Sequence, residues 1–145
     1  MPLRTRHLQR RLFPFVATDV QPGTAPAGKL YVFANTEMPG LLKIGSTRKS
    51  VGKRRRELQR QTANPGRFIT QLWYSAHSVR IHKDEVHAIL VGYRVETGKE
   101  FFRVSLEVAY QKMRAYFGRE PDWMANDLRR RLEAQGLLGK AADPP

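Results

Sequence analysis

The sequence predicts an α/β domain of the α+β kind, in which helices flank a small central mixed or antiparallel β-sheet of about three strands. Two short apolar segments, residues 30–34 and 41–46, are separated by turn-forming residues. Residues 68–74 form a run rich in β-branched and aromatic side chains. Later segments have apolar residues at helical spacing. A chain of 145 residues that is 41% hydrophobic suits a single core.

The first predicted element is a β-hairpin. Asn35, Pro39 and Gly40 supply turn chemistry between residues 30–34 and 41–46, which both read as strands. We expect the next element to be a helix over residues 51–61 with Ser50 as its N-cap. Its spacing places Leu58 on the buried side and leaves a basic face toward solvent.

The second half of the chain predicts one more strand and three more helices. Residues 68–74 are expected to form the central strand, and residues 78–93 a helix. Residues 100–104 read as a short strand or extended stretch, and Ser105 as the cap of a helix that runs to about residue 117. Pro121 would open a fourth helix with Trp123 and Met124 on its apolar stripe, ended by Gly136.

These elements predict three segments. Residues 1–27 would be a flexible basic arm and linker, residues 28–117 the main folded domain, and residues 118–145 a C-terminal helix with a disordered tail. The arm carries Arg4, Arg6, Arg10 and Arg11. It reads as a segment that contacts phosphates, as an organellar transit peptide or as an unstructured tail without a role.

Composition narrows the class of partner. The 26 Lys and Arg residues exceed the 13 Asp and Glu residues, which gives a net charge of +13. Such an excess favours a polyanion, with nucleic acid ahead of an anionic membrane. Cysteine is absent, so disulfides and thiolate chemistry are excluded and a cytoplasmic location is expected. No run approaches the roughly 18 apolar residues of a membrane span, so neither insertion in a membrane nor secretion is expected.

Three side chains on the predicted strand-turn-strand-helix unit suit phosphodiester chemistry. They are the phenol of Tyr31, the ammonium group of Lys43 and the guanidinium group of Arg54. Hydrolysis requires that an attacking water lose a proton and that developing negative charge be neutralised. We therefore expect a cleft on the sheet face that carries Tyr31 and Lys43.

The motifs around these residues resemble the GIY-YIG endonuclease superfamily, in particular its branch of short phage and bacterial proteins with a Lys-Ile-Gly second motif. Tyr31 closes the first motif, and Lys43 opens Lys-Ile-Gly after eleven intervening residues. Arg54 stands four residues before Leu58, as at the family's helical arginine. His87 on the next helix and the Glu-Phe-Phe segment at residues 100–102 continue the similarity.

The resemblance implies a metal-dependent endonuclease that hydrolyses DNA, with Mg²⁺ or another divalent cation as cofactor. Tyr31 would hydrogen-bond or deprotonate the attacking water, Lys43 would assist, and Arg54 would stabilise the pentacovalent phosphate, with His87 as a fourth catalytic candidate. The family's helix glutamate is replaced here by Lys83, which leaves other carboxylates to hold the metal. Those metal candidates are Glu100 and Glu85, and the nucleic-acid-binding candidates are Arg48, Lys49, Lys53, Arg55, Arg56 and Arg60.

Other interpretations of the same residues remain open. Tyr31 can be a packed aromatic residue of the sheet, and His87 a hydrogen-bonded structural histidine. Because of Lys83, the chain can also be a DNA-binding module with reduced catalysis. An RNA-associated basic protein is a further alternative.

Overall fold

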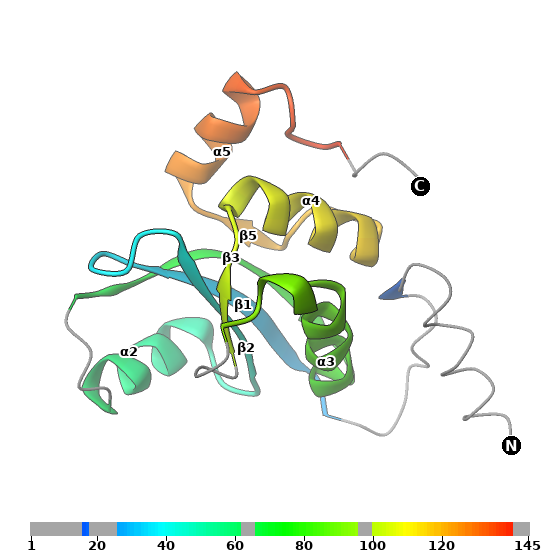
Figure 1. The fold of residues 1–145 in the computed structure, drawn as a ribbon. Coiled ribbons are helices and arrows are strands. Elements are labelled where there is room, and N and C mark those ends of the chain that lie inside the picture. Colours follow the sequence, from blue (N-terminus) through cyan, green and yellow to red (C-terminus); the bar gives the residue numbers. More distant parts are fainter. Residues whose placement is uncertain (1–15, 18–25, 62–65, 96–99, 141–145) are drawn as a thin grey trace, which may run out of the picture.

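The computed structural model describes residues 16–17, 26–61, 66–95 and 100–140, and these residues form an antiparallel sheet with helices on both faces (Figure 1). Most of the predicted basic arm, its four arginines included, and the tail beyond residue 140 lie outside the described residues. The strands are β1 (Gly28–Asn35), β2 (Leu41–Thr47), β3 (Phe68–Ala76), β4 (Phe101–Arg103) and β5 (Trp123–Met124). Their order across the sheet is β4-β2-β1-β3-β5, and every neighbouring pair is antiparallel.

The α+β class is confirmed, and the number of strands is not. The described sheet has five strands where about three were predicted, and its central strand is β1 rather than residues 68–74. The two strands beyond the predicted three are short edge strands: β4, beside β2, lies within residues 100–104, which were predicted as a short strand or extended stretch, whereas β5, beside β3, was not predicted. A strand of two residues such as β5 carries almost no local signal, because pairing with a neighbour defines it rather than propensity.

The strand β5 corrects one helix prediction. Trp123 and Met124 were expected on a helix, but the backbone on either side of them bonds to β3. The amide of Asp122 donates to the Trp73 carbonyl at 3.0 Å, and the amide of Ala125 donates to the Gln71 carbonyl at 2.8 Å. The helix α5 therefore begins only at Asn126 and runs to Ala134 (Asn126–Ala134).

The other helices agree more closely with expectation. They are α2 (Val51–Gln61), α3 (Val79–Ile89) and α4 (Leu106–Phe117). Both predicted serine caps are confirmed, because Ser50 Oγ accepts from the amide of Lys53 at 3.2 Å and Ser105 Oγ accepts from the amide of Val108 at 3.1 Å. The helix α3 is shorter than predicted, since a 3₁₀ turn at Val91–Tyr93 follows it.

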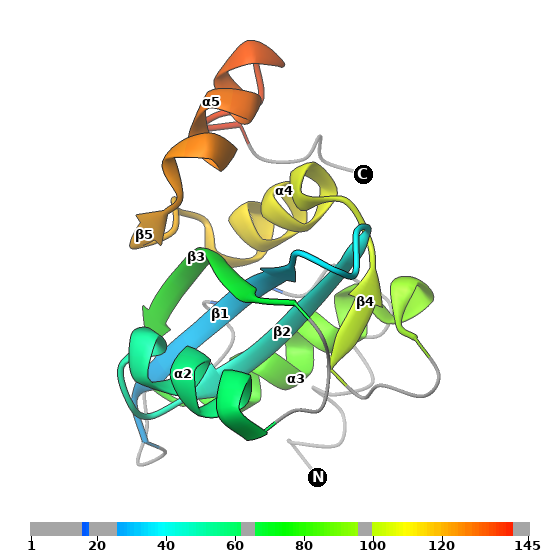
Figure 2. The same cartoon turned by 90° about the vertical axis from the view of Figure 1, so that its left-hand side faces the viewer.

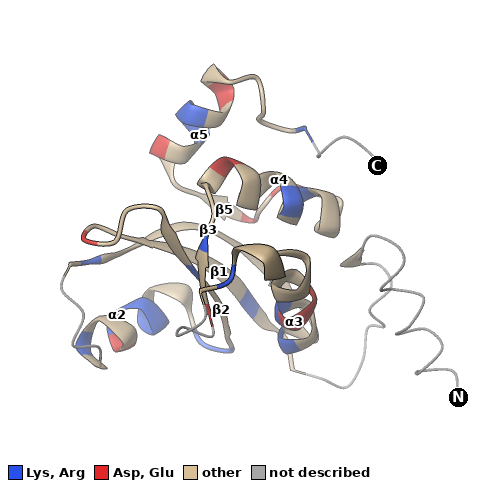
Figure 3. Cartoon of the chain, viewed as in Figure 1, with Lys and Arg blue, Asp and Glu red and all other residues tan. Residues whose placement is uncertain are grey.

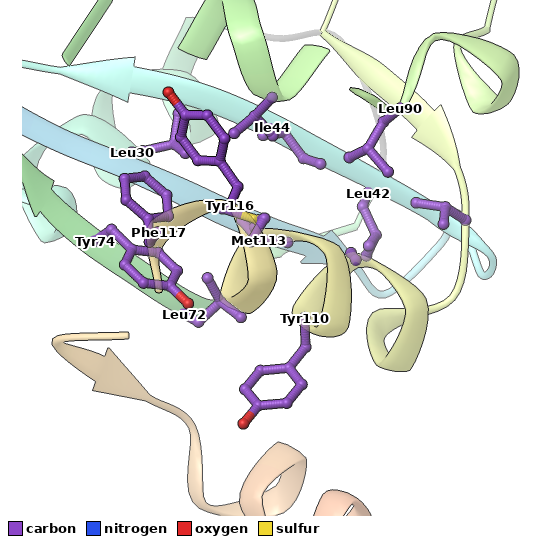
Figure 4. Close-up of a cluster of buried hydrophobic side chains, with 14 of the residues drawn as sticks. Leu30, Leu42, Ile44, Leu72, Tyr74, Leu90, Tyr110, Met113, Tyr116 and Phe117 are labelled. Carbon is purple, nitrogen blue, oxygen red and sulfur yellow. The ribbon is translucent and has the colours of Figure 1, made fainter. Parts of the chain in front are cut away.

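The sheet separates two hydrophobic cores. On one face α3 and α4 cover the larger core, to which α5 adds Leu128 and Leu132. Figure 4 shows side chains of this core, in which leucines and an aromatic ring from the sheet pack against aromatic rings from α4. On the other face α2 packs against the sheet (Figure 2), over a smaller core that includes Tyr31, Phe33 and Leu58. The site described next lies on this second face.

Candidate active site

The register of the hairpin brings Tyr31 and Lys43 onto one face of the sheet. Tyr31 pairs with Gly45, and Phe33 pairs with Lys43. Directly opposite residues of an antiparallel pair point to the same side, as do residues two apart on one strand. The prediction that Tyr31 and Lys43 share a sheet face is therefore confirmed, and the face is the one that α2 covers.

The hydroxyl of Tyr31 is an unusual buried group. The residue is 0% exposed and its ring stacks on Phe33 with 4.1 Å between the centroids. Within the described part of the chain its hydroxyl makes no hydrogen bond of normal geometry. Burial raises the pKa of the phenol, and the charge of Glu100 raises it further, whereas the nearby guanidinium group of Arg54 lowers it. The phenol is therefore neutral at pH 7.

Gly45 keeps the Tyr31 hydroxyl and the Glu100 carboxylate close together. A Cβ atom at residue 45 would lie 2.5 Å from the Tyr31 hydroxyl oxygen and 2.8 Å from Glu100 Oε1. The missing side chain thus leaves the small space into which both oxygens point. The backbone also fixes Glu100 here, because the amide of Ile44 donates to the Glu100 carbonyl at 2.9 Å.

Replacing Gly45 by alanine is expected to destabilise the protein. Tyr31 is fully buried and cannot move aside cheaply, so we expect a loss of about 1–3 kcal/mol, as for other overpacked cores. Thermal unfolding followed by circular dichroism would show a midpoint lowered by roughly 3–10 °C. Gly92→Ala is the matched control, since a Cβ there has nothing within 4 Å. Equal midpoints for the two variants would contradict this account.

Two lysines hold the Glu100 carboxylate. Lys43 Nζ lies 3.3 Å from Glu100 Oε1, and Lys83 Nζ lies 3.4 Å from Glu100 Oε2. The three side chains are between 13% and 27% exposed, so water screens their charges only in part. Glu100, which is far from Lys43 and Lys83 in the sequence, therefore joins the second strand of the hairpin to α3.

Arg54 reaches the site from α2. Its position one turn after the Ser50 cap places it near the Tyr31 phenol, with which it interacts electrostatically. Glu57 Oε2 forms an ion pair with Arg54 Nη1 at 3.5 Å, and Glu57 Oε1 accepts a hydrogen bond from Lys49 Nζ at 2.8 Å. The bond from Lys49 is the main reason why the pKa of Glu57 is lowered. Arg54 is therefore oriented but keeps part of its guanidinium group open to the cleft, with 31% of the side chain exposed.

A pocket of about 500 Å³ opens beside Arg54 and Lys83, which both line it. It lies between the end of β2, the start of α2 and the start of α3, and the ribbon in Figure 3 carries Lys and Arg positions on both of these helices. A volume of this size can hold a small anionic group with its neighbours. Five of its lining residues are cationic and one is acidic: Arg48, Lys49, Arg54, Arg80 and Lys83, with Glu57.

His87 lies apart from the pocket and is engaged on both ring nitrogens. The Arg94 guanidinium group can only donate, so His87 Nδ1 accepts from it at 2.8 Å and Nε2 donates to the Ile44 carbonyl at 2.7 Å. Burial lowers the pKa of the imidazole. This geometry favours the structural interpretation of His87, in which the ring joins α3 to β2.

Glu85, the second carboxylate considered for metal, also lies elsewhere. It is 7% exposed, and its Oε2 accepts from the Tyr116 hydroxyl at 2.9 Å, on the side of α3 that faces α4. The structure therefore does not bring Glu85 to Glu100. Among the described residues no three His, Cys, Asp or Glu side chains are grouped as metal ligands would be.

The candidate nucleic-acid contacts fall into two groups. Arg48 and Lys49 line the pocket, whereas Lys53, Arg56 and Arg60 lie exposed along α2 and Arg55 is half-buried. Sequence reasoning did not identify Arg80 and Lys83 as cationic residues that line the pocket. Both stand on one side of α3 at a spacing of three residues, which was the available signal.

The fold and the pocket define a small basic α+β domain with a cationic cleft at an end of its antiparallel sheet. The chain belongs to the T5orf172 domain family, whose match covers residues 28–116. No curated protein and no solved structure gives a significant match. None of the helices in the described ranges has the length and apolarity needed to cross a bilayer.

This membership corrects the expectation that the chain is a GIY-YIG endonuclease. The family match is to a different domain family. The resemblance relied on short motifs around Tyr31 and Lys43, which lie on the two strands of one hairpin. Motifs of three residues on strands do not distinguish one family from another. The chemistry of the cleft is therefore argued below from its own residues.

Proposed function

We propose that the chain is a metal-dependent endonuclease that hydrolyses phosphodiester bonds of DNA at the cationic pocket. The observation that carries the proposal is the Tyr31 hydroxyl, which is fully buried, has no hydrogen-bond partner in the described chain and points into the space beside Gly45 and Glu100. An unsatisfied buried hydroxyl costs about 1–3 kcal/mol. Such a hydroxyl is more readily tolerated where a bound ligand or a water molecule supplies its missing hydrogen bond.

The pocket supplies the binding energy in this proposal. Arg48, Arg80 and Lys83 line it and attract a phosphate without regard to sequence. The exposed cations of α2 continue the basic surface outward from Arg54. Together they align the DNA backbone so that one phosphate lies between Arg54 and Tyr31.

The reaction assigned to these residues is hydrolysis by an in-line water. The Tyr31 phenolate, a minor species at pH 7, takes the proton as the water oxygen bonds to phosphorus, and the ester bond to the leaving oxygen breaks. The leaving oxygen regains a proton from solvent. Arg54 neutralises the charge that develops on the phosphate oxygens, and Lys43 adds a second positive charge on the same face.

Glu100 is the side chain that would hold Mg²⁺. Its carboxylate borders the space left by Gly45, and Mg²⁺ often uses only one or two protein carboxylates while keeping several waters. Bound there, the ion would supply Lewis-acid stabilisation of the phosphate. Lys43 and Lys83 compete for the same oxygens, so the site fits a weakly bound cation.

Nicking of supercoiled plasmid by the purified chain tests the proposal. Mg²⁺-dependent conversion to the open circular form, lost in EDTA and in Glu100→Gln, is the expected result. Binding of the plasmid without nicking at any Mg²⁺ concentration would contradict it. That outcome would instead support a DNA-binding module with reduced catalysis, which the two ammonium groups on Glu100 favour as the second candidate.

Removing Lys83 is expected to strengthen cation binding. Lys83→Gln takes one positive charge from Glu100 Oε2, and a partly exposed ion pair of this kind corresponds to about 1.5- to 5-fold in affinity. Calorimetric titration with Mn²⁺ in the absence of DNA would measure the change directly. Lys112→Gln on α4, across the sheet, is the control. An unchanged affinity in Lys83→Gln would argue that the cation does not bind at Glu100.

A further inference from the structure

A row of side chains runs across four strands from the candidate active site to the edge of the sheet. Gly45 pairs with Tyr31, Tyr31 with Trp73, and Trp73 with Trp123. Because these pairs are antiparallel and directly opposite, all four positions lie on the face that α2 covers. The row passes from the fully buried Tyr31 to Trp123, which is 42% exposed.

The two tryptophans occupy the open end of this row, Trp73 partly buried against the smaller core and Trp123 exposed beside it on the neighbouring strand. A single exposed apolar side chain needs no explanation, but here a second indole stands directly beside it on β3. Lys29 Nζ lies 5.5 Å from the centroid of the Trp73 ring, within the range of a cation–π contact. A positive charge is thus placed over the Trp73 ring.

A cationic path joins the two indole rings to the pocket. A second hollow of about 390 Å³ is lined by Lys29, Ser75, His77 and Arg48. Arg48 also lines the main pocket. A nucleic-acid backbone that leaves the main pocket past Arg48 would therefore reach Lys29 and then the indole rings.

We propose that Trp73 and Trp123 are a base-stacking site that receives an unpaired nucleobase next to the phosphodiester held in the pocket. The inference rests on the proposed function and narrows its substrate class to single-stranded or locally unpaired DNA. Every base has an apolar π-face that stacks on aromatic side chains, and basic residues along the path hold the backbone. Bases inside a duplex are already stacked and must first be extruded.

Intrinsic fluorescence gives a direct test, because the chain contains two tryptophans and both belong to the proposed site. The full chain is titrated in EDTA at one fixed salt concentration with a short thymidine oligonucleotide and with an abasic oligonucleotide of equal length. We expect the thymidine strand to quench the emission and the abasic strand, bound through its phosphates alone, to leave it nearly unchanged. Equal quenching by both strands would overturn the proposal.

Substitution of Trp123 tests the stacking separately from the charge. Trp123→Ala is expected to weaken binding of the thymidine strand by about 5- to 100-fold and binding of the abasic strand by less than about 2-fold. Trp123→Phe keeps an aromatic face and should retain most of the affinity. Ile81→Ala, at a side chain on α3 that is 45% exposed, is the control for removal of a surface hydrophobic group. Equal losses for both strands in Trp123→Ala would overturn the proposal.

The two proposals fail in different ways. Base-dependent quenching in EDTA together with no nicking in Mg²⁺ would contradict the nuclease function and support the stacking site. Nicking of plasmid together with base-independent quenching would do the reverse. Circular dichroism of each variant shows whether β5 and the rest of the fold are retained, and Trp123→Phe remains informative if Trp123→Ala unfolds.

Discussion

Tyr31→Phe is expected to lower Mg²⁺-dependent nicking by about 100- to 1,000-fold while leaving the fold as stable as before. The loss follows because the variant has no group at this position that can take a proton from water. Stability is retained because the hydroxyl makes no hydrogen bond of normal geometry in the described chain, so its removal ends a desolvation cost and loses only the interaction with the Arg54 guanidinium group. Initial nicking rates and thermal midpoints measured on the same preparations would separate the two effects.

Tyr93→Phe is the matched control for this variant, because Tyr93 is 39% exposed and lies outside the pocket. It should change neither nicking nor stability. Nicking by Tyr31→Phe at the rate of the natural sequence would remove the proposed base from the mechanism. A large fall in its thermal midpoint would instead identify Tyr31 as a packing residue whose hydroxyl has a structural partner.

The pH dependence of the natural chain follows from the same burial. Because burial raises the pKa of Tyr31 above its ordinary value near 10, the phenolate fraction grows about tenfold per pH unit through the neutral range. Nicking should rise with that slope, and Tyr31→Phe should remove it. The stability of the fold should change with pH in the opposite direction to the nicking rate. A phenol with a raised folded-state pKa contributes stability below pH 10, and that contribution is lost as the pH rises through the folded-state pKa.

Local signals were sufficient for the parts of the site that are close in sequence. The turn residues between two apolar segments predicted the hairpin, and the alternation of a strand then placed Tyr31 and Lys43 on one face. The Ser50 cap and the Leu58 stripe likewise predicted α2, which carries Arg54. These elements form from neighbouring residues, so their signals are complete within short windows.

Contacts between segments that are distant in the sequence could not be predicted from such local signals. The pairing of Trp73 with Trp123 joins β3 to an edge strand of two residues, whose sequence reads equally well as the start of a helix. The separation of Glu85 from Glu100 depends on which side of α3 faces α4, and both sides carry polar residues. Such choices are made by tertiary packing, which overrides local preference.

Arg54→Ala is the second variant with a large expected effect, about 100- to 1,000-fold in the nicking rate at saturating DNA. The guanidinium group is the one placed beside the Tyr31 phenol, so its removal takes away charge stabilisation at the reacting phosphate. Affinity should fall by less than about 5-fold, because Arg48, Arg80 and Lys83 still line the pocket. Single-turnover rates and binding isotherms, measured separately, would show this division.

Arg55→Ala is the control for Arg54→Ala, since it removes the same charge from the next residue of α2 and leaves the guanidinium group near Tyr31 in place. We expect it to change the nicking rate by less than about 2-fold. Arg54→Lys should recover only part of the rate, because an ammonium group lacks the planar fork that binds two phosphate oxygens at once. If Arg54→Ala and Arg55→Ala lose affinity equally and rate not at all, α2 is only a surface that attracts DNA, and the transition-state role assigned to Arg54 is wrong.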